Sequence, residues 1–120
     1  MSQSQATRPT AFAQLMATIE SRKANPPERS YTTSLFQGGV EKIGRKILEE
    51  ANEVVEAAAE PGDEGRSHFI HETADLIYHL FVMLGHQGVK LEEVEAELCQ
   101  RFGVSGLDEK AARNQKGSSR

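Results

Sequence analysis

The strongest constraint on the fold is the stretch from Ser67 to Gln87, where polar and apolar residues separate at a helical period. On a helical projection, its polar side chains fall within an arc of roughly 120°. They are His68, His71, Glu72, Asp75, Tyr78, His79 and His86. The rest of the circumference is apolar, which is more surface than short neighbouring helices can cover. We therefore expect this helix to lie in a bundle that a second copy of the chain completes.

Proline and glycine divide the chain into helical segments. The expected helices cover residues 11–23, 40–60, 67–85 and 91–102, with a possible short turn at 35–37 before the second. Pro61-Gly62 ends the second helix, and Ser67 is the expected N-cap of the third. No alternating β pattern of useful length is present. The expected fold class is all-α, a four-to-five-helix bundle completed by homodimerisation.

The chain of 120 residues fits one domain. We place that domain at residues 11–112, between a polar N-terminal segment (1–10) and a tail (113–120) expected to be mobile. The net charge of −4 argues against general nucleic-acid binding. No apolar run is long enough for a membrane span, and residues 1–10 lack a signal core. Cys99 is the single cysteine, so no disulfide can form within the chain, and we expect a cytoplasmic location. Cys99 itself is expected to be a packing residue.

Two acidic pairs carry the clearest chemical signal. Glu50 and Glu53 lie three residues apart on one expected helix, as do Glu72 and Asp75 on the next. This spacing places both members of a pair on one helix face. Packed together, the helices would gather four carboxylates that need a cation to neutralise them. Oxygen ligands favour Mg²⁺ or Mn²⁺ over zinc, and such an ion can hold a phosphate chain.

The helical position of Glu50 distinguishes this site from an ordinary solvated face. In projection, Ile43 and Val54 fall within roughly 80° of Glu50. Arg45, Asn52 and Glu56 occupy the opposite face. The second helix adds a related signal, because no lysine or arginine occurs between residues 67 and 87. Acids and imidazoles without cationic neighbours are typical of a cleft.

Two longer motifs resemble a known family. The run from Lys46 to Glu53 (KILEEANE), followed by residues 72–79 (ETADLIYH), is similar to the EExxE and ExxD signature of the all-α nucleoside triphosphate pyrophosphohydrolases. Residues 30–32 (SYT), Lys42, Lys46 and residues 105–113 (SGLDEKAAR) narrow the resemblance to the phosphoribosyl-ATP pyrophosphatase family. The similarity extends from about Phe12 to Arg113.

The resemblance implies a function and assigns roles to residues. It implies Mg²⁺-dependent hydrolysis of phosphoribosyl-ATP to phosphoribosyl-AMP and pyrophosphate, the second step of histidine biosynthesis. It assigns metal binding to Glu50, Glu53, Glu72 and Asp75. Glu49 and Glu53 are the candidates for activating water. Substrate contacts are expected from Ser30, Tyr31, Thr32, Lys42, Lys46, Tyr78 and His79. The chain has neither the length nor the thiols for a fused cyclohydrolase, so a separate cyclohydrolase is the expected pathway partner.

Several alternatives remain open from the residues alone. The same acidic cluster would serve a housecleaning pyrophosphohydrolase for non-standard nucleoside triphosphates. A non-catalytic helical dimerisation module with an acidic binding face is a third possibility. Lys46 and Glu50 could form only an i,i+4 salt bridge, and residues 30–32 could be a simple helix cap. His68 and His71 form an i,i+3 pair that could bind zinc or be structurally silent.

Overall fold

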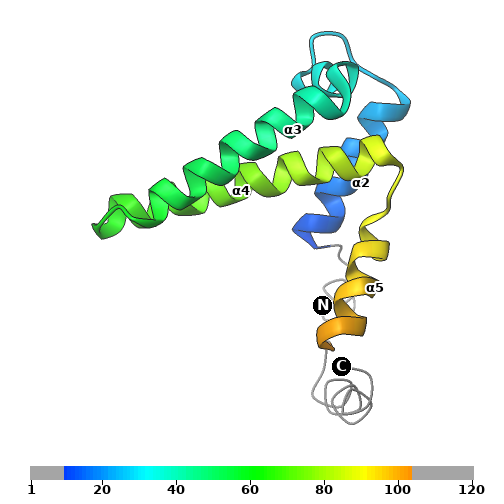
Figure 1. The fold of residues 1–120 in the computed structure, drawn as a ribbon. Helices are drawn as coiled ribbons and strands as arrows, with labels where there is room; N and C mark the ends of the chain where they lie inside the picture. Colours follow the sequence, from blue (N-terminus) through cyan, green and yellow to red (C-terminus); the bar gives the residue numbers. More distant parts are fainter. Residues whose placement is uncertain (1–9, 104–120) are drawn as a thin grey trace, which may run out of the picture. The chain divides into compact units, whose positions relative to one another are not determined.

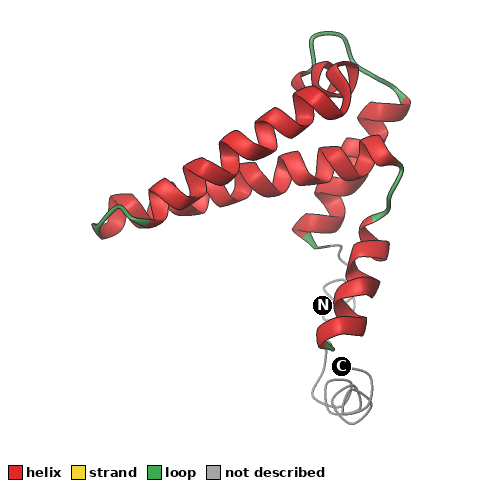
Figure 2. Cartoon of the chain, viewed as in Figure 1, coloured by secondary structure: helices red, strands yellow, loops and turns green. Residues whose placement is uncertain are grey.

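The computed structural model describes residues 10–103, and within this range it contains four α-helices and no strand (Figure 2). The helices are α2 (Ala11–Ala24), α3 (Tyr31–Ala58), α4 (Gly62–Gln87) and α5 (Leu91–Phe102). The chain divides into two compact units at residues 89 and 90, so that α2, α3 and α4 form one unit and α5 belongs to the other. The all-α prediction is therefore confirmed for the described residues. None of these helices is both long and apolar enough to cross a membrane.

The first unit is an antiparallel hairpin of α3 and α4 with α2 packed against it. The two long helices run side by side over most of their length (Figure 1), and α2 contacts α4 more extensively than α3. Its core is built from side chains of all three helices, namely Met16, Ile19, Leu35, Ile43, Phe81 and Val82. The rings of Phe12 and Phe81 meet edge to face with their centroids 5.7 Å apart. Lys23 Nζ also donates a hydrogen bond to the Gly85 carbonyl oxygen at 2.7 Å.

The start of α3 differs from the prediction. We expected a connector through Ser34 and a long helix from Val40. The part of α3 after the kink at Gly39 agrees with that helix, but helical structure already begins at Tyr31. Ser30 caps it, because its side-chain oxygen accepts a hydrogen bond from the Thr33 amide at 3.3 Å. The short turn expected at 35–37 is the first part of this helix. Gly39, with φ 68° and ψ −162°, interrupts the helical backbone within α3, a conformation that glycine adopts without a Cβ clash.

The start of α4 also differs. Ser67 was expected as the N-cap, but α4 begins at Gly62 with Pro61 as its N-cap, so this prediction was wrong. Asp63 and Glu64 lie in the first turn, where negative charge is favourable at the positive end of the helix dipole. The helix therefore gains more than a turn over its expected length. The predicted break at Pro61-Gly62 is confirmed, since α3 ends at Ala58.

The second unit contains α5, whose bounds agree with the prediction. Its start is closed by a hydrogen bond from the Lys90 amide to Glu93 Oε2 at 3.0 Å. Arg101 Nε contacts Glu97 Oε2 at 2.8 Å one helical turn away. Cys99 lies on this helix with intermediate burial. The 105–113 motif and the 113–120 tail lie outside the described residues, as does all of the N-terminal segment except Thr10.

Candidate metal and phosphate site

The facing sides of α3 and α4 form an acidic groove. It has a volume of about 470 Å³, and its lining residues are Lys46, Glu49, Glu50, Asn52, Glu53, Glu72 and Asp75. Both acidic pairs therefore line one groove, as their helical spacing predicted. Two helices contribute, and in each of them the i,i+3 spacing turns both acids to the same side. The assignment of these four residues to a metal remains a prediction.

Glu50 has the most perturbed environment among the acids of the groove. Its side chain is only 13% exposed, as is that of Glu72. Burial raises the pKa of Glu50, and a hydrogen bond with Glu72 and the charge of Asp75 raise it further. Lys46 opposes this effect from a distance of 3.8 Å between its Nζ and Glu50 Oε2. The groove therefore favours either a proton on Glu50 or a cation bound beside it.

The two lysines occupy different positions. Lys46 lines the groove, and its Nζ lies 3.0 Å from Glu49 Oε1. This hydrogen bond is the largest cause of the raised pKa of Lys46. Lys42 is not among the lining residues, and its Nζ contacts Ser34 Oγ at 3.5 Å. The salt-bridge alternative for Lys46 and Glu50 is thus compatible with the geometry, although the primary partner is Glu49.

A second polar cluster joins the start of α3 to α4 beside the groove. Tyr31 Oη lies 2.8 Å from His79 Nε2, and His79 Nδ1 lies 2.8 Å from the backbone oxygen of Asp75. Thr32 and Tyr78 are joined by a short hydrogen bond between their hydroxyl groups. Thr32 and His79 are buried. These contacts fix the start of α3 against the turn of α4 that carries Asp75.

The hydrogen-bond pattern of His79 defines its tautomer. A carbonyl oxygen only accepts, so Nδ1 carries the hydrogen that it donates to Asp75. In the neutral imidazole, Nε2 then accepts from the Tyr31 hydroxyl. Burial raises the pKa of Tyr31, an effect that the charge of Lys46 partly offsets. Substrate contact by these residues stays a prediction, while their structural contacts are clear.

Comparison with known proteins identifies the family. A profile of the family described as phosphoribosyl-ATP pyrophosphohydrolase matches residues 12–102. The chain belongs to this family. A phosphoribosyl-ATP pyrophosphatase of Rhodopirellula baltica is 55% identical over 105 residues, which cover 88% of each chain. A phosphoribosyl-ATP pyrophosphatase of Rhodobacter capsulatus is 48% identical over 104 residues, covering 87% of this chain and 98% of the relative. The resemblance drawn from the acidic motifs is thus confirmed.

Two residues of the α3–α4 hairpin make contributions that the sequence did not predict, one inside the acidic groove and one outside it. Asn52 lines the groove although helical projection placed it on the opposite face of its helix. Glu60 hydrogen-bonds His68 across the turn between α3 and α4, with 3.0 Å between Glu60 Oε1 and His68 Nδ1. This hydrogen bond is the largest cause of the raised pKa of His68. Helical periodicity carries no signal for such a contact, because the two residues belong to different elements.

Proposed function

We propose that this protein hydrolyses phosphoribosyl-ATP to phosphoribosyl-AMP and pyrophosphate with Mg²⁺, the second step of histidine biosynthesis. The observation that carries the proposal is the acidic groove between α3 and α4 in a chain of the phosphoribosyl-ATP pyrophosphohydrolase family. Relatives that share about half of their residues with this chain are named phosphoribosyl-ATP pyrophosphatases. The groove offers carboxylates for a cation and a lysine for a phosphate.

The donor set of the groove fits Mg²⁺. Glu50, Glu53, Glu72 and Asp75 offer carboxylate oxygens, which are the ligands that this hard cation prefers. The raised pKa of Glu50 supports the assignment, because a largely buried carboxylate beside two other acids is stabilised by a neighbouring cation. When bound there, Mg²⁺ would supply positive charge that offsets the charge of a triphosphate and polarises the phosphorus.

The other residues of the site position the substrate and the attacking water. We assign phosphate contacts to Lys46, which lines the groove, and to Lys42, which lies one turn earlier on α3 and outside the lining. Glu49 and Glu53 are exposed, so either carboxylate can accept a proton from water as that water attacks phosphorus. Ser30, Tyr31 and Thr32 hold the start of α3 beside the groove, with Tyr78 and His79 as their partners or near neighbours on α4.

The experiment is a pyrophosphate-release assay with phosphoribosyl-ATP and Mg²⁺. The wild-type chain should release pyrophosphate, and the double variant Glu50→Gln/Asp75→Asn should remain folded and lose turnover. Cleavage of ordinary or non-standard nucleoside triphosphates but not of phosphoribosyl-ATP would instead indicate a housecleaning enzyme. Unchanged function in the double variant would indicate a non-catalytic module.

The proposal includes a homodimer and a separate cyclohydrolase. Large apolar side chains are exposed along the α3–α4 hairpin, and they include Val40, Leu48, Val55, Phe69, Ile70 and Leu80. A second copy of the chain packed against this surface would remove it from water. Sedimentation at micromolar concentration should give a dimer, and a monomer would contradict this part. The product, phosphoribosyl-AMP, would pass to a separate cyclohydrolase, and we place both steps in the cytoplasm.

A further inference from the structure

His68 lies between two carboxylates and uses both ring nitrogens. Its Nδ1 lies 3.0 and 3.1 Å from the two carboxylate oxygens of Glu60. Its Nε2 lies 3.2 Å from Glu72 Oε2. Glu60 belongs to the turn between α3 and α4, whereas Glu72 belongs to the acidic groove. The imidazole therefore connects the end of the hairpin to the groove.

The contact with Glu60 gives the imidazole the orientation of a metal ligand. An ionised carboxylate only accepts hydrogen bonds, so Nδ1 must carry a hydrogen. In the neutral ring, Nε2 then carries the lone pair, and in the protonated ring it carries a second hydrogen. This nitrogen faces Glu72. Histidines that bind metals commonly have this arrangement, in which one nitrogen donates to a carboxylate and the other binds the ion. A cation between Nε2 and Glu72 would replace the hydrogen on that nitrogen.

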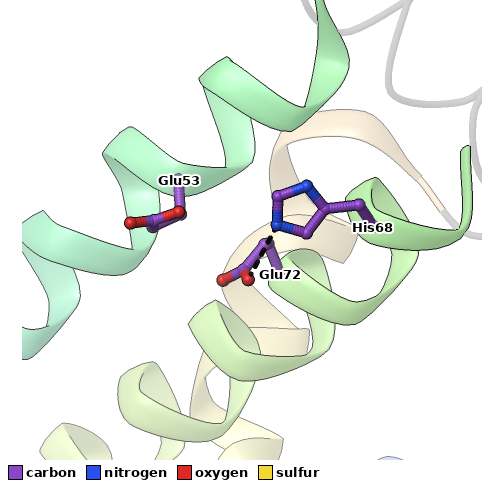
Figure 3. Close-up of side chains that lie close together, drawn as sticks. All are labelled: Glu53, His68 and Glu72. Atoms are coloured by element: carbon purple, nitrogen blue, oxygen red, sulfur yellow. Dashed lines mark hydrogen bonds and ion pairs between the residues drawn. The ribbon is translucent and has the colours of Figure 1, made fainter. Parts of the chain in front are cut away.

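Glu53 supplies a third ligand from the opposite helix. Ligand atoms of Glu53, His68 and Glu72 all lie within 4.8 Å of one another. Figure 3 shows Glu53 extending from α3, with the His68 ring and the Glu72 carboxylate beside each other on α4. Glu53 is exposed, so its side chain can rotate towards an ion without disturbing the core. The three residues thus provide one nitrogen and two oxygen ligands from two helices.

We propose that Glu53, His68 and Glu72 form a binding site for a divalent ion of the zinc class, oriented by Glu60. Imidazole nitrogen favours Zn²⁺ and neighbouring first-row ions over Mg²⁺, which prefers oxygen ligands. Three protein ligands leave a coordination position open for water or a phosphate oxygen. The site is distinct from the all-oxygen Mg²⁺ set because it requires His68.

The two ions would compete for shared ligands. This consequence rests on the proposed function, in which Glu53 and Glu72 also serve Mg²⁺. An ion held by His68 would draw both carboxylates towards the turn between α3 and α4. We therefore expect Zn²⁺ to inhibit the Mg²⁺-dependent reaction, and excess Mg²⁺ to relieve the inhibition.

The test measures zinc binding to the full chain without substrate, by calorimetry and by ¹⁵N NMR of the histidine rings. The chain has four histidines, so the ring spectrum is simple to assign. In the wild type, Zn²⁺ should shift one Nε2 resonance. The spectrum of His68→Gln should lack this resonance, which assigns it to His68. That variant should bind Zn²⁺ at least about tenfold more weakly, and Glu60→Gln should lose about 10- to 100-fold. Mg²⁺ affinity, measured in the same way, should change less than Zn²⁺ affinity in both variants, because neither variant replaces one of the four carboxylates assigned to Mg²⁺.

His71→Gln is the matched control. His71 lies one turn along α4, and its Nε2 lies 3.4 Å from Asp75 Oδ2, so it belongs to a different group of possible ligands. The His71→Gln variant should bind Zn²⁺ with the affinity of the wild type. Unchanged zinc affinity in His68→Gln, or a loss confined to His71→Gln, would overturn the proposal. Pyrophosphate release with Mg²⁺ alone, measured in parallel, reports separately on the proposed function.

Discussion

Removal of the Tyr31 hydroxyl tests whether the cluster beside the groove is structural. In Tyr31→Phe the ring remains, so its stacking against Tyr78, with centroids 6.2 Å apart, is retained. The 2.8 Å hydrogen bond to His79 Nε2 is lost. His79 is only 4% exposed, so its nitrogen is left without its partner in a site that water reaches poorly.

The expected loss follows from these contacts. An ordinary intramolecular hydrogen bond contributes about 1 kcal/mol, and a buried group left unsatisfied costs about 1–3 kcal/mol. Tyr31 itself is 48% exposed, which lets water approach from its side and favours the lower part of this range. We expect the free energy of unfolding to fall by about 1–2 kcal/mol. For a domain of this size the melting temperature should fall by roughly 5–15 °C.

Urea unfolding followed by far-ultraviolet circular dichroism measures this change. Ser34→Ala is the matched control, because it removes an exposed hydrogen bond to the Tyr31 carbonyl oxygen in the same helical turn, together with the long 3.5 Å contact to Lys42 Nζ. Its stability should change by less than about 0.5 kcal/mol. Wild-type stability in Tyr31→Phe, combined with a raised KM for phosphoribosyl-ATP, would refute the structural argument. The hydroxyl would then act on the substrate.

Three further predictions concern charge and backbone. Because the pKa of Glu50 is raised above 4.5, the folded state binds more protons than the unfolded state between the two pKa values. Without divalent cations, stability should therefore fall as pH rises through that window, and Glu50→Gln should be more stable than wild type at pH 7 in thermal melts. The pKa of His68 is raised above 6.5 by Glu60, so their interaction stabilises the fold below 6.5 and is lost as pH rises through the folded-state pKa. Melts of Glu60→Gln should show their largest deficit at the acidic end, and a deficit independent of pH would contradict this reasoning. Gly39→Ala should lower the free energy of unfolding by about 1–3 kcal/mol in thermal melts, because φ 68° with ψ −162° is a conformation essentially confined to glycine. Gly44→Ala, at a helical position with open space for a Cβ, should instead raise it by about 0.5–1 kcal/mol.

Local sequence signals were sufficient for most of the helices and for the convergence of the acids. The bounds of α5 and the break at Pro61-Gly62 follow from apolar periodicity and from residues that end helices. The groove follows from the i,i+3 spacing of Glu50 with Glu53 and of Glu72 with Asp75. These features depend on residues close together in the chain, so a single sequence contains them.

Features that depend on contacts between elements could not be predicted. Periodicity alone did not show that a helical segment from Tyr31 precedes the break at Gly39, because this segment is short. The pairing of Tyr31 with His79 joins residues 48 positions apart. The contact of Glu60 with His68 crosses a turn. The sequence indicated Tyr31, His79 and His68 as notable residues, but it indicated neither their partners nor the involvement of Glu60.

The distribution of burial along the hairpin explains how the acidic groove can exist in a stable fold. The buried residues of α2, Met16 and Ile19, lie near Gly85, towards the end of α4. The acidic residues lie farther along the hairpin, where Leu48 and Val55 are exposed. Apolar burial where α2 packs against the hairpin stabilises the fold, and repulsion between the carboxylates of the groove destabilises it. Because both regions belong to the same two long helices, the first contribution can offset the second. In this part of the hairpin α2 leaves an apolar surface exposed, which includes Leu48 and Val55. We infer that a partner on this surface would stabilise the part of the hairpin that carries the carboxylates, which links the proposed dimer to the proposed metal site.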